Sequence, residues 1–365
     1  MSDLSQIPVC DMHCDTAFEI LAGKSLKSED CQVNLPAMKE ANVKIQVFAC
    51  YVSPVTSKGS RFPIVMDMIS AFRKEVEKYA DEIALCTNSA EIDAATSAGK
   101  IAAILAVENG MAMENNIYNL QTIYEAGVRL MTIVHSVSSD WAISSNDENP
   151  AFDGLTDDGV KMIEQMNRLG MIIDVSHAHE KTVARVLESS EQPIVASHSC
   201  AASICPVPRN LTDEQITEIA SRGGMVGVNF FPGFLDYDYY QTLLTECGDL
   251  FDKLDEMERQ AHGDPKKVSD AFQEYRDEFR QKMAGKKVSL DTVIDHVEHI
   301  RALAGDDAVG FGSDFDGVPA LPDGINSVAD FKKLQERMIQ RGITGEALEK
   351  ISYKNFLRVF QDVVG

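Results

Sequence analysis

Val9-Cys10-Asp11-Met12-His13-Cys14-Asp15-Thr16 is the first of eight similar runs that decide the fold of this chain. Its apolar start and polar end predict a β-strand, in which side chains two positions apart point to the same face. His13 and Asp15 would therefore point together, and Cys14 would face the other way. An imidazole beside a carboxylate can form half of a divalent-metal site. The same pair can also be a histidine held by a hydrogen bond.

Seven further apolar runs follow, with turn residues and stretches of helical periodicity between them. The runs span residues 43–51, 101–107, 129–134, 171–175, 194–197, 225–229 and 309–313, and the helical stretches include 118–126, 157–169, 179–189 and 213–221. Strands that alternate with helices form a parallel sheet, and eight of them close a (β/α)8 barrel of the TIM type. A doubly wound open sheet is the alternative. It is disfavoured because no Gly-x-Gly-x-x-Gly motif follows the first strand.

Residues 236–290 break this alternation. The segment begins with Asp236-Tyr237-Asp238-Tyr239-Tyr240 and continues through a highly charged stretch. It predicts a helical insertion after the seventh strand, either over the mouth of the barrel or at a subunit contact. Because no internal repeat, low-complexity tract or linker divides the chain, residues 1–365 are predicted to form a single barrel domain.

The composition indicates a globular protein that does not bind polyanions. The chain of 365 residues carries 34 basic and 57 acidic side chains, and its net charge of −23 would repel nucleic acid and anionic membrane surfaces. Met1 to Gln6 lacks the basic start and apolar run of a secretory signal, and no stretch approaches the ~20 apolar residues of a membrane span. The eight scattered cysteines show no disulfide framework. We therefore expect a cytoplasmic protein without a membrane partner.

Polar residues gather at the ends of the predicted strands, where the active site of such a barrel lies. Beyond His13 and Asp15, they are Glu108 after the third strand, His135 after the fourth, His177 after the fifth, His198 after the sixth, and Asp314 and Asp316 after the eighth. Each alone has a structural interpretation, such as a helix-start acid, a capping histidine or a turn before Gly317. Together they would be costly to bury without a partner, and a metal ion supplies one.

The composition of this ring suits two metal ions. Three histidines, one aspartate and one glutamate fill two zinc sites when one carboxylate bridges the ions and each ion keeps an open position. Two ions about 3.5–4 Å apart can hold a hydroxide between them as the nucleophile and polarise a carbonyl. A nearby carboxylate would take the proton from that water and pass it to the leaving amine, and Asp314 is the candidate.

These motifs resemble the membrane (renal) dipeptidase family of the metal-dependent amidohydrolase superfamily. The matching pieces run in order through the chain at residues 11–16, 107–110, 174–177, 197–199, 209–211, 228–230 and 312–317. The resemblance implies a distorted (β/α)8 barrel, a homodimer and hydrolysis of dipeptides, often with a D-residue at the C-terminal position. The animal members are secreted and lipid-anchored. Because neither signal is found in this sequence, the chain is more similar to a soluble bacterial-type member.

Carried over residue by residue, the resemblance implies two zinc ions per subunit. His13 and Asp15 would bind one ion, His177 and His198 would bind the second, and Glu108 would bridge both.

Three further residues would act on the substrate. The resemblance implies that His135 hydrogen-bonds the substrate carbonyl or its oxyanion, and that Arg209 holds the terminal carboxylate of the dipeptide. Asp314 would be the general acid and base. A planar guanidinium can hold a carboxylate through two parallel hydrogen bonds, which supports Arg209 independently of the resemblance. Asn210, the next residue, is predicted to be structural.

The leading hypothesis is a binuclear zinc dipeptidase. An N-acyl-amino-acid deacylase would use the same ions and Arg209, because both substrates present an amide beside a free carboxylate. A catalytically silent scaffold is disfavoured because every ligand and Asp314 are present, and a phosphodiester-cleaving barrel is disfavoured by the net charge of −23. Asn109 and residues 136–141 depart from the family pattern, which leaves the metal site intact and affects the side-chain preference.

Overall fold

Nine parallel β-strands form one sheet in the computed structural model, which describes residues 7–365. Met1 to Gln6, where the sequence predicts no secretory signal, lie outside the described residues. Eight strands follow one another around the sheet, and the short β3 pairs outside this path with β4. The strands are β1 (Val9–Asp11), β2 (Val43–Tyr51), β3 (Ile83–Leu85), β4 (Ile101–Glu108), β5 (Val128–Thr132), β6 (Ile172–Asp174), β7 (Val195–Ala196), β8 (Met225–Val228) and β9 (Val309–Phe311).

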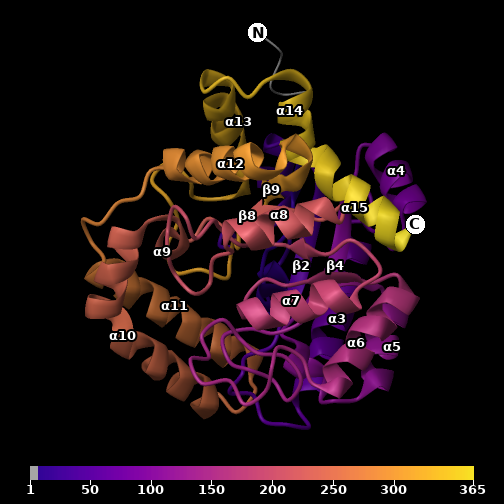
Figure 1. Cartoon of the computed structure of the whole chain (residues 1–365), viewed down its shortest axis with the longest axis vertical. Helices are drawn as coiled ribbons and strands as arrows, with labels where there is room; N and C mark the ends of the chain where they lie inside the picture. Colours follow the sequence, from indigo (N-terminus) through magenta and orange to yellow (C-terminus); the bar gives the residue numbers. More distant parts are fainter. Residues whose placement is uncertain (1–6) are drawn as a thin grey trace.

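The sheet closes into a barrel where its first and last strands meet. The Met12 N–H donates to the Phe311 carbonyl at 2.9 Å, and Cys14 pairs with Phe315 in an isolated parallel bridge. Figure 1 shows the strands at the centre of the molecule and the helices around them. The predicted (β/α)8 barrel is therefore confirmed. The doubly wound alternative is wrong, because an open sheet would leave these two strands as free edges.

The first strand is shorter than the sequence predicts. It ends at Asp11, so the expectation of a strand that continues to Asp15 is wrong. The Asp11 carboxylate accepts the backbone N–H groups of His13 at 3.5 Å and Ser313 at 2.8 Å, which turns the chain out of the regular ladder. Cys14 nevertheless points into the apolar core, where its thiol donates to the Val47 carbonyl at 3.4 Å.

Helices follow most strands and form the outer layer of the barrel. The longer ones are α1 (Thr16–Leu21), α2 (Leu35–Glu40), α3 (Arg61–Lys78), α4 (Ser89–Ser97), α5 (Ile117–Glu125), α6 (Asp157–Leu169), α7 (Glu180–Ser189), α8 (Asp213–Ser221), α10 (Tyr237–Gln260), α11 (Pro265–Lys282), α12 (Leu290–Ala304), α13 (Phe331–Gln340) and α15 (Asn355–Val364). Short helical turns are η2 (Gly110–Met113), α9 (Pro232–Leu235), η3 (Asp306–Ala308), η4 (Val328–Asp330), α14 (Gly345–Glu349) and η5 (Lys350–Lys354).

The predicted helical stretches agree with the structure to within one residue. Helices α6 and α8 begin where expected because the Thr156 and Thr212 side chains accept the N–H groups of Gly159 and Gln215. Helix α7 starts one residue later than predicted, because His179 is its N-terminal cap and accepts the Lys181 N–H at 3.1 Å.

The segment after β8, the seventh strand around the barrel, forms the two helices α10 and α11, as the sequence predicts. Glu258 of α10 accepts a hydrogen bond from Ser53, just beyond the end of β2. Ser269 of α11 donates to Glu19 of α1 at 2.8 Å. Figure 1 shows the pair at one side of the barrel, opposite α4 and α15. The insertion thus packs against segments that follow the carboxyl ends of the barrel strands.

Alternate strand residues fill the barrel interior. Ile45, Val47 and Ala49 of β2 belong to a buried apolar cluster that also contains Phe356 and Phe360 of α15. Every second side chain of a strand points into the barrel. At the carboxyl end of each strand, the next inward-pointing side chain therefore lies at the mouth of the barrel.

All eight cysteines lie within the described residues, and they are buried and unpaired. Across residues 7–365, none of the helices combines the length and the apolar character needed to cross a bilayer.

His296 of α12 connects the loop at Ala201 to the end of α9 as a neutral imidazole. Its Nδ1 accepts the Ala201 N–H at 3.1 Å, and its Nε2 lies 3.1 Å from the Leu235 carbonyl, to which it donates. The ring is fully buried, and burial lowers the pKa of His296 from 6.5 to about 4.

We expect this histidine to make the fold sensitive to acid. In the unfolded chain this histidine is protonated below pH 6.5, whereas in the folded chain it stays neutral down to about pH 4. The contribution of His296 to the free energy of unfolding is therefore fully present above pH 6.5. It falls by up to about 3 kcal/mol as the pH is lowered from 6.5 to about 4. Urea unfolding of the metal-free protein at neutral and acidic pH should show a larger loss for wild type than for His296→Gln. Equal losses would contradict the prediction.

Candidate metal centre and active site

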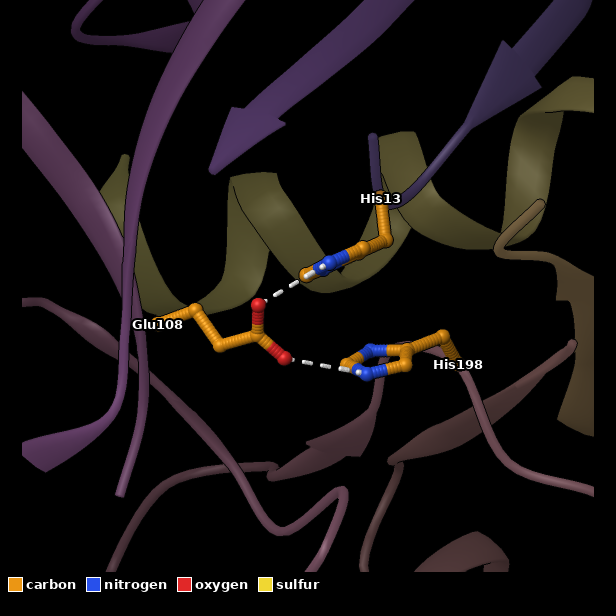
Figure 2. Close-up of side chains that lie close together, drawn as sticks. All are labelled: His13, Glu108 and His198. Carbon is orange, nitrogen blue, oxygen red and sulfur yellow. Dashed lines mark ion pairs between the residues drawn. The ribbon is translucent and has the colours of Figure 1, made fainter. Parts of the chain in front are cut away.

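Glu108, the last residue of β4, lies among four imidazole rings. Its Oε1 is 3.2 Å from His177 Nε2, 3.3 Å from His198 Nε2 and 3.8 Å from His135 Nε2, and its Oε2 is 3.5 Å from His13 Nε2. Figure 2 shows the carboxylate between His13 and His198, with one oxygen directed toward each ring. Two oxygens that face different histidines give this carboxylate the geometry of a bridging ligand.

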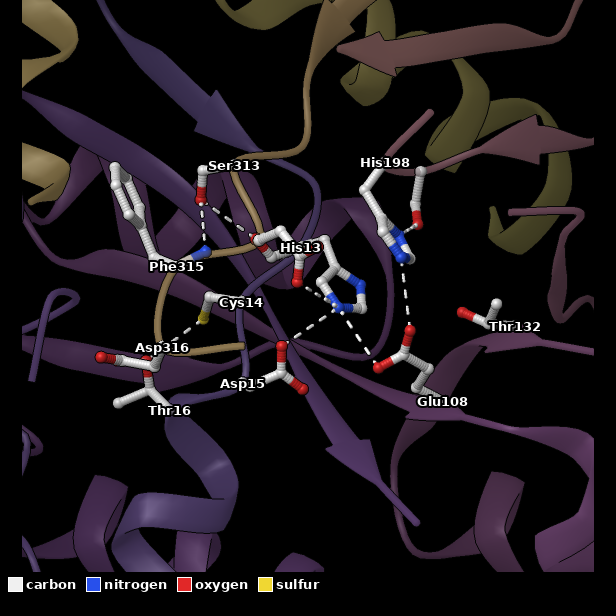
Figure 3. Close-up of polar contacts among 12 residues, drawn as sticks. His13, Cys14, Asp15, Thr16, Glu108, Thr132, His198, Ser313, Phe315 and Asp316 are labelled. Carbon is white, nitrogen blue, oxygen red and sulfur yellow. Dashed lines mark hydrogen bonds and ion pairs between the residues drawn. The ribbon is translucent and has the colours of Figure 1, made fainter. Parts of the chain in front are cut away.

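Two more carboxylates surround His13. Its Nε2 is 3.5 Å from Asp15 Oδ2 and 3.9 Å from Asp314 Oδ1. Figure 3 shows the ring between Asp15 and Glu108. Asp15, Glu108 and Asp314 are 8%, 3% and 9% exposed, so three carboxylates share one largely dry space. The predicted residues therefore converge, although those of β1 lie beyond the strand rather than on it.

Buried polar atoms without partners indicate that this cluster fits a cation. Within residues 7–365, the two ring nitrogens of His13 and Oδ1 of Asp15 are buried and lack a hydrogen-bond partner. The possible ligand sets, with atoms within 4.8 Å of one another, are His13, Glu108 and His198; Glu108, His135 and His177; and His13, Asp15 and Asp314. Imidazole and carboxylate ligands suit zinc and also accept manganese or cobalt. The donor set therefore fits divalent metal ions.

The environment of each ring determines its protonation. Burial alone would lower the pKa of His13, but the neighbouring Glu108 and other carboxylates raise it well above its usual value. Burial lowers the pKa values of His177 and His198. The neutral rings have lone pairs free for a metal, and a divalent ion beside His13 would replace its proton.

His135 lies at the open side of the cluster. Its side chain is 20% exposed, and its ring centre is 4.1 Å from that of His177 and 4.8 Å from that of Tyr51. Burial lowers the pKa of His135 to about 4, so the ring is neutral near pH 7. Ser136 Oγ lies 3.1 Å from its Nδ1. A hydroxyl that donates to Nδ1 leaves Nε2 as an N–H donor, as binding to a substrate carbonyl requires.

Arg209 is held rigidly beside this cluster. The side chain is 6% exposed, and its two terminal nitrogens donate to Ser199 Oγ and to the His198 carbonyl, both at 2.7 Å. Among the described residues, its buried Nε has no acceptor. The contact with the His198 carbonyl places the guanidinium close to the centre, and its positive charge contributes, after burial, to the lowered pKa of His177. A free N–H on a fixed guanidinium is suited to an incoming carboxylate.

Asp314 is positioned by a residue that the sequence analysis did not single out. Asn229 Nδ2 donates to Asp314 Oδ2 at 2.8 Å, which leaves Oδ1 facing His13. The Asp314 backbone has φ +63° and its N–H donates to the His13 carbonyl at 3.2 Å. Asn229 lies in one of the matching motifs, 228–230, and this was the only signal for it in the sequence.

Gly317, which the sequence analysis treated only as a turn residue, also lies against the carboxylates of the cluster. A Cβ atom at this position would lie 2.0 Å from Asp15 Oδ2 and 2.6 Å from Asp314 Oδ1. Only a glycine therefore lets the loop after β9 approach the two carboxylates this closely.

We expect Gly317→Ala to weaken metal binding by about 10–100-fold, the loss typical of a change in a residue that orients metal ligands. The new methyl group must displace Asp15, Asp314 or the loop itself. Metal affinity can be measured by competition with a chromophoric chelator. Gly248→Ala is the matched control, because a Cβ there meets nothing within 4 Å. Unchanged affinity in Gly317→Ala would show that the loop can move without cost to the site.

Other polar residues near the predicted ring have structural contacts instead. Asp316 accepts the Thr16 hydroxyl at 2.6 Å and the Gln32 N–H at 2.8 Å, away from the histidines. Asn210, as predicted, donates to backbone carbonyls, those of Cys205 and Phe234. Asn109 has φ +87°, a conformation that glycine adopts without strain, and its side chain donates to the Val52 carbonyl at 2.9 Å.

Comparison with known proteins identifies relatives of this chain. Dipeptidase 3 of Mus musculus is 29% identical over 336 residues, which cover 91% of this chain and 58% of the mouse protein. The chain thus spans less than two thirds of that relative's length. A solved metallopeptidase of family M19, dipeptidase AC, is 25% identical with a TM-score of 0.80, covering 98% of this chain and 99% of that one.

A second solved structure shares the fold. It is a metallopeptidase from Rhodobacter sphaeroides liganded with a phosphinate mimic of the dipeptide L-Ala-D-Ala, 24% identical with a TM-score of 0.79 over 98% of this chain and 99% of that one. The model of the family described as "Membrane dipeptidase (Peptidase family M19)" matches residues 3–364. Because this match spans nearly the whole chain, the protein belongs to the membrane dipeptidase family.

Proposed function

We propose that this protein is a metal-dependent dipeptidase, built as a single hydrolase barrel, that cleaves the amide bond of dipeptides. The observation that carries the proposal is the buried Glu108 carboxylate, whose two oxygens face His13 on one side and His177 and His198 on the other. Family membership supports the same activity.

The proposed ligands follow the two sides of this carboxylate. His13 and Asp15 would hold one zinc ion, His177 and His198 the other, and Glu108 both. When bound, two such ions lower the pKa of a water molecule and polarise the scissile carbonyl.

Asp314 is the proposed general base and acid. Its Oδ2 is engaged by Asn229, so Oδ1 is the oxygen that can accept a proton from the attacking water. Oδ1 then delivers this proton to the nitrogen of the leaving amine as the C–N bond breaks. His135, neutral near pH 7 with its Nδ1 at Ser136, would donate from Nε2 to the oxygen that gains charge.

Arg209 is the proposed anchor for the C-terminal carboxylate of the substrate. Ser199 and the His198 carbonyl fix the guanidinium, and its buried Nε–H has no hydrogen-bond partner among the described residues. Because the guanidinium contacts the backbone carbonyl of the proposed ligand His198, this anchor favours substrates in which a single residue follows the scissile bond. We include a D-residue at that position, as in the ligand of the Rhodobacter sphaeroides relative.

We further propose a cytoplasmic homodimer. The buried, unpaired cysteines suit a reducing compartment.

Helix α10 has three exposed apolar side chains at intervals of seven positions: Tyr237, Leu244 and Phe251, which are 40%, 49% and 44% exposed. They form an apolar stripe suited to contact with a second copy of the chain. Sedimentation of wild type and a Leu244→Glu/Phe251→Glu double variant should show a dimer and a monomer. A monomeric wild type would contradict this assembly.

Hydrolysis by the zinc-loaded protein tests the function. We expect turnover of L-L and L-D dipeptides, complete loss with a chelator, and recovery when zinc is restored. N-acetylated amino acids in the same panel test the deacylase alternative, which predicts that these are cleaved and free dipeptides are not. A protein that holds two metal ions and cleaves no amide in the panel would refute the proposal.

A further inference from the structure

Asp174, the last residue of β6, is fully buried. Its Oδ1 accepts the N–H groups of Ser176 at 2.9 Å and Ser197 at 2.8 Å. Its Oδ2 lies 2.6 Å from Thr132 Oγ1 and 2.5 Å from Ser197 Oγ. The contacts join the ends of β5, β6 and β7, which are neighbours in the sheet.

These contacts determine the direction of every hydrogen bond. A carboxylate is an acceptor with about four lone-pair sites, and here two backbone N–H groups and two hydroxyl groups fill them. Both hydroxyl groups must donate, because Asp174 has no proton to give. The Ser197 hydroxyl proton is therefore committed to Asp174.

Ser197 Oγ can then only accept from its other polar neighbours, which are the Ser176 hydroxyl at 3.4 Å and His198 Nδ1. His198 Nδ1 lies 2.7 Å from Ser197 Oγ, so Nδ1 carries the ring proton and donates to the serine. The lone pair of His198 is consequently on Nε2, the atom that faces Glu108 at 3.3 Å and His177 at 2.9 Å. The Ser176 hydroxyl also accepts the His198 N–H at 3.0 Å, which holds the backbone of the same residue.

We propose that Asp174 and Ser197 act as positioning residues, a carboxylate–serine–histidine relay that fixes His198 in the Nδ1–H tautomer and strengthens its Nε2 as a metal ligand. The inference rests on the proposed metal site. A negative charge that reaches an imidazole through a hydrogen bond increases the basicity of the opposite nitrogen, and groups of this kind typically contribute ~10–100-fold in metal affinity.

The relay distinguishes His198 from His13 and His135. Within residues 7–365, Nδ1 of His13 has no hydrogen-bond partner. In the described part of the chain, Nδ1 of His135 contacts only the hydroxyl of Ser136, at the partly exposed side of the site. The ion bound by His198 is therefore the one expected to depend on Asp174, and the ion beside Asp15 is not.

Metal affinity of Ser197→Ala tests the relay directly. Stepwise zinc binding, measured against a competing chelator, should show one ion weakened by about 10–100-fold and the other unchanged. Asp174→Asn should weaken the binding of the same ion. If Asp174→Asn does not fold, the result for Ser197→Ala alone decides the test. In ¹⁵N-histidine spectra of the metal-free protein, His198 should be the Nδ1–H tautomer in wild type and a mixture in Ser197→Ala.

Ser352→Ala is the matched control. Ser352 is fully buried, and its hydroxyl lacks a partner among the described residues, so its removal deletes a buried hydroxyl without a relay. Equal zinc affinities in wild type and Ser197→Ala, or an equal fall in Ser352→Ala, would overturn the proposal. If wild type binds both ions but cleaves no dipeptide, the proposed function fails, while the affinity measurements still decide the relay.

Discussion

Asp314→Asn is expected to lower kcat for dipeptides by about 10²–10⁴-fold while metal binding stays near that of wild type. Asparagine has the same shape as aspartate and can still accept the hydrogen bond that Asn229 donates at 2.8 Å. Its amide cannot take a proton from water or return one to an amine. Steady-state kinetics together with elemental analysis of the purified variant would separate turnover from metal content.

A neighbouring aspartate provides the control for this prediction. Asp316 is also buried, but it contacts Thr16 and the Gln32 N–H rather than the histidine cluster. Asp316→Asn should therefore lower the free energy of unfolding and leave kcat within a few-fold of wild type. Loss of a metal ion from Asp314→Asn would assign Asp314 to the ligands, since its Oδ1 belongs to one of the possible ligand sets.

Glu108→Gln should weaken the binding of both ions and reduce activity by more than about 10³-fold, because one substitution affects two metal sites. The carboxylate is 3% exposed and is the only acid within reach of His177 and His198 among the described ion pairs. Glutamine keeps the volume but removes the negative charge that offsets two divalent cations in a low-dielectric interior, where charge is costly to leave unbalanced. Zinc titration of the variant should require higher metal concentrations for both steps.

Glu19 offers a matched comparison for Glu108. It is a glutamate of similar burial, 5% exposed, but it binds Lys24 and Ser269 outside the metal centre. Glu19→Gln should affect the packing of α11 and leave zinc affinity unchanged. If Glu108→Gln bound both ions as tightly as wild type, the bridging role would be wrong.

Without a bound metal ion, we expect the buried carboxylates of the centre to lower the free energy of unfolding. Asp15, Glu108 and Asp314 are nearly buried around His13, and such a cluster of like charges is costly in a protein interior. A divalent ion that binds only the folded chain converts this cost into stabilisation. The unfavourable repulsion between buried carboxylates therefore lies at the site of the proposed chemistry.

The sequence by itself determined the barrel and the set of polar residues at its mouth. Apolar runs that alternate with helical stretches specify parallel strands, and parallel strands in a barrel present their carboxyl ends on one face. Glu108, His177 and His198 could thus be grouped although they lie far apart in the chain. The starts of α6 and α8 were predictable for a local reason, because Thr156 and Thr212 cap helices within three residues of themselves.

Only the tertiary structure decided which distant groups contact each other. The first strand ends at Asp11 because that carboxylate binds Ser313, a residue near the other end of the chain. The same holds for Asn229 on Asp314, for the glycine at 317 against Asp15, and for the serine that joins Asp174 to His198. Local propensity contains no information about such pairs, because each depends on the register between strands that meet only when the barrel closes.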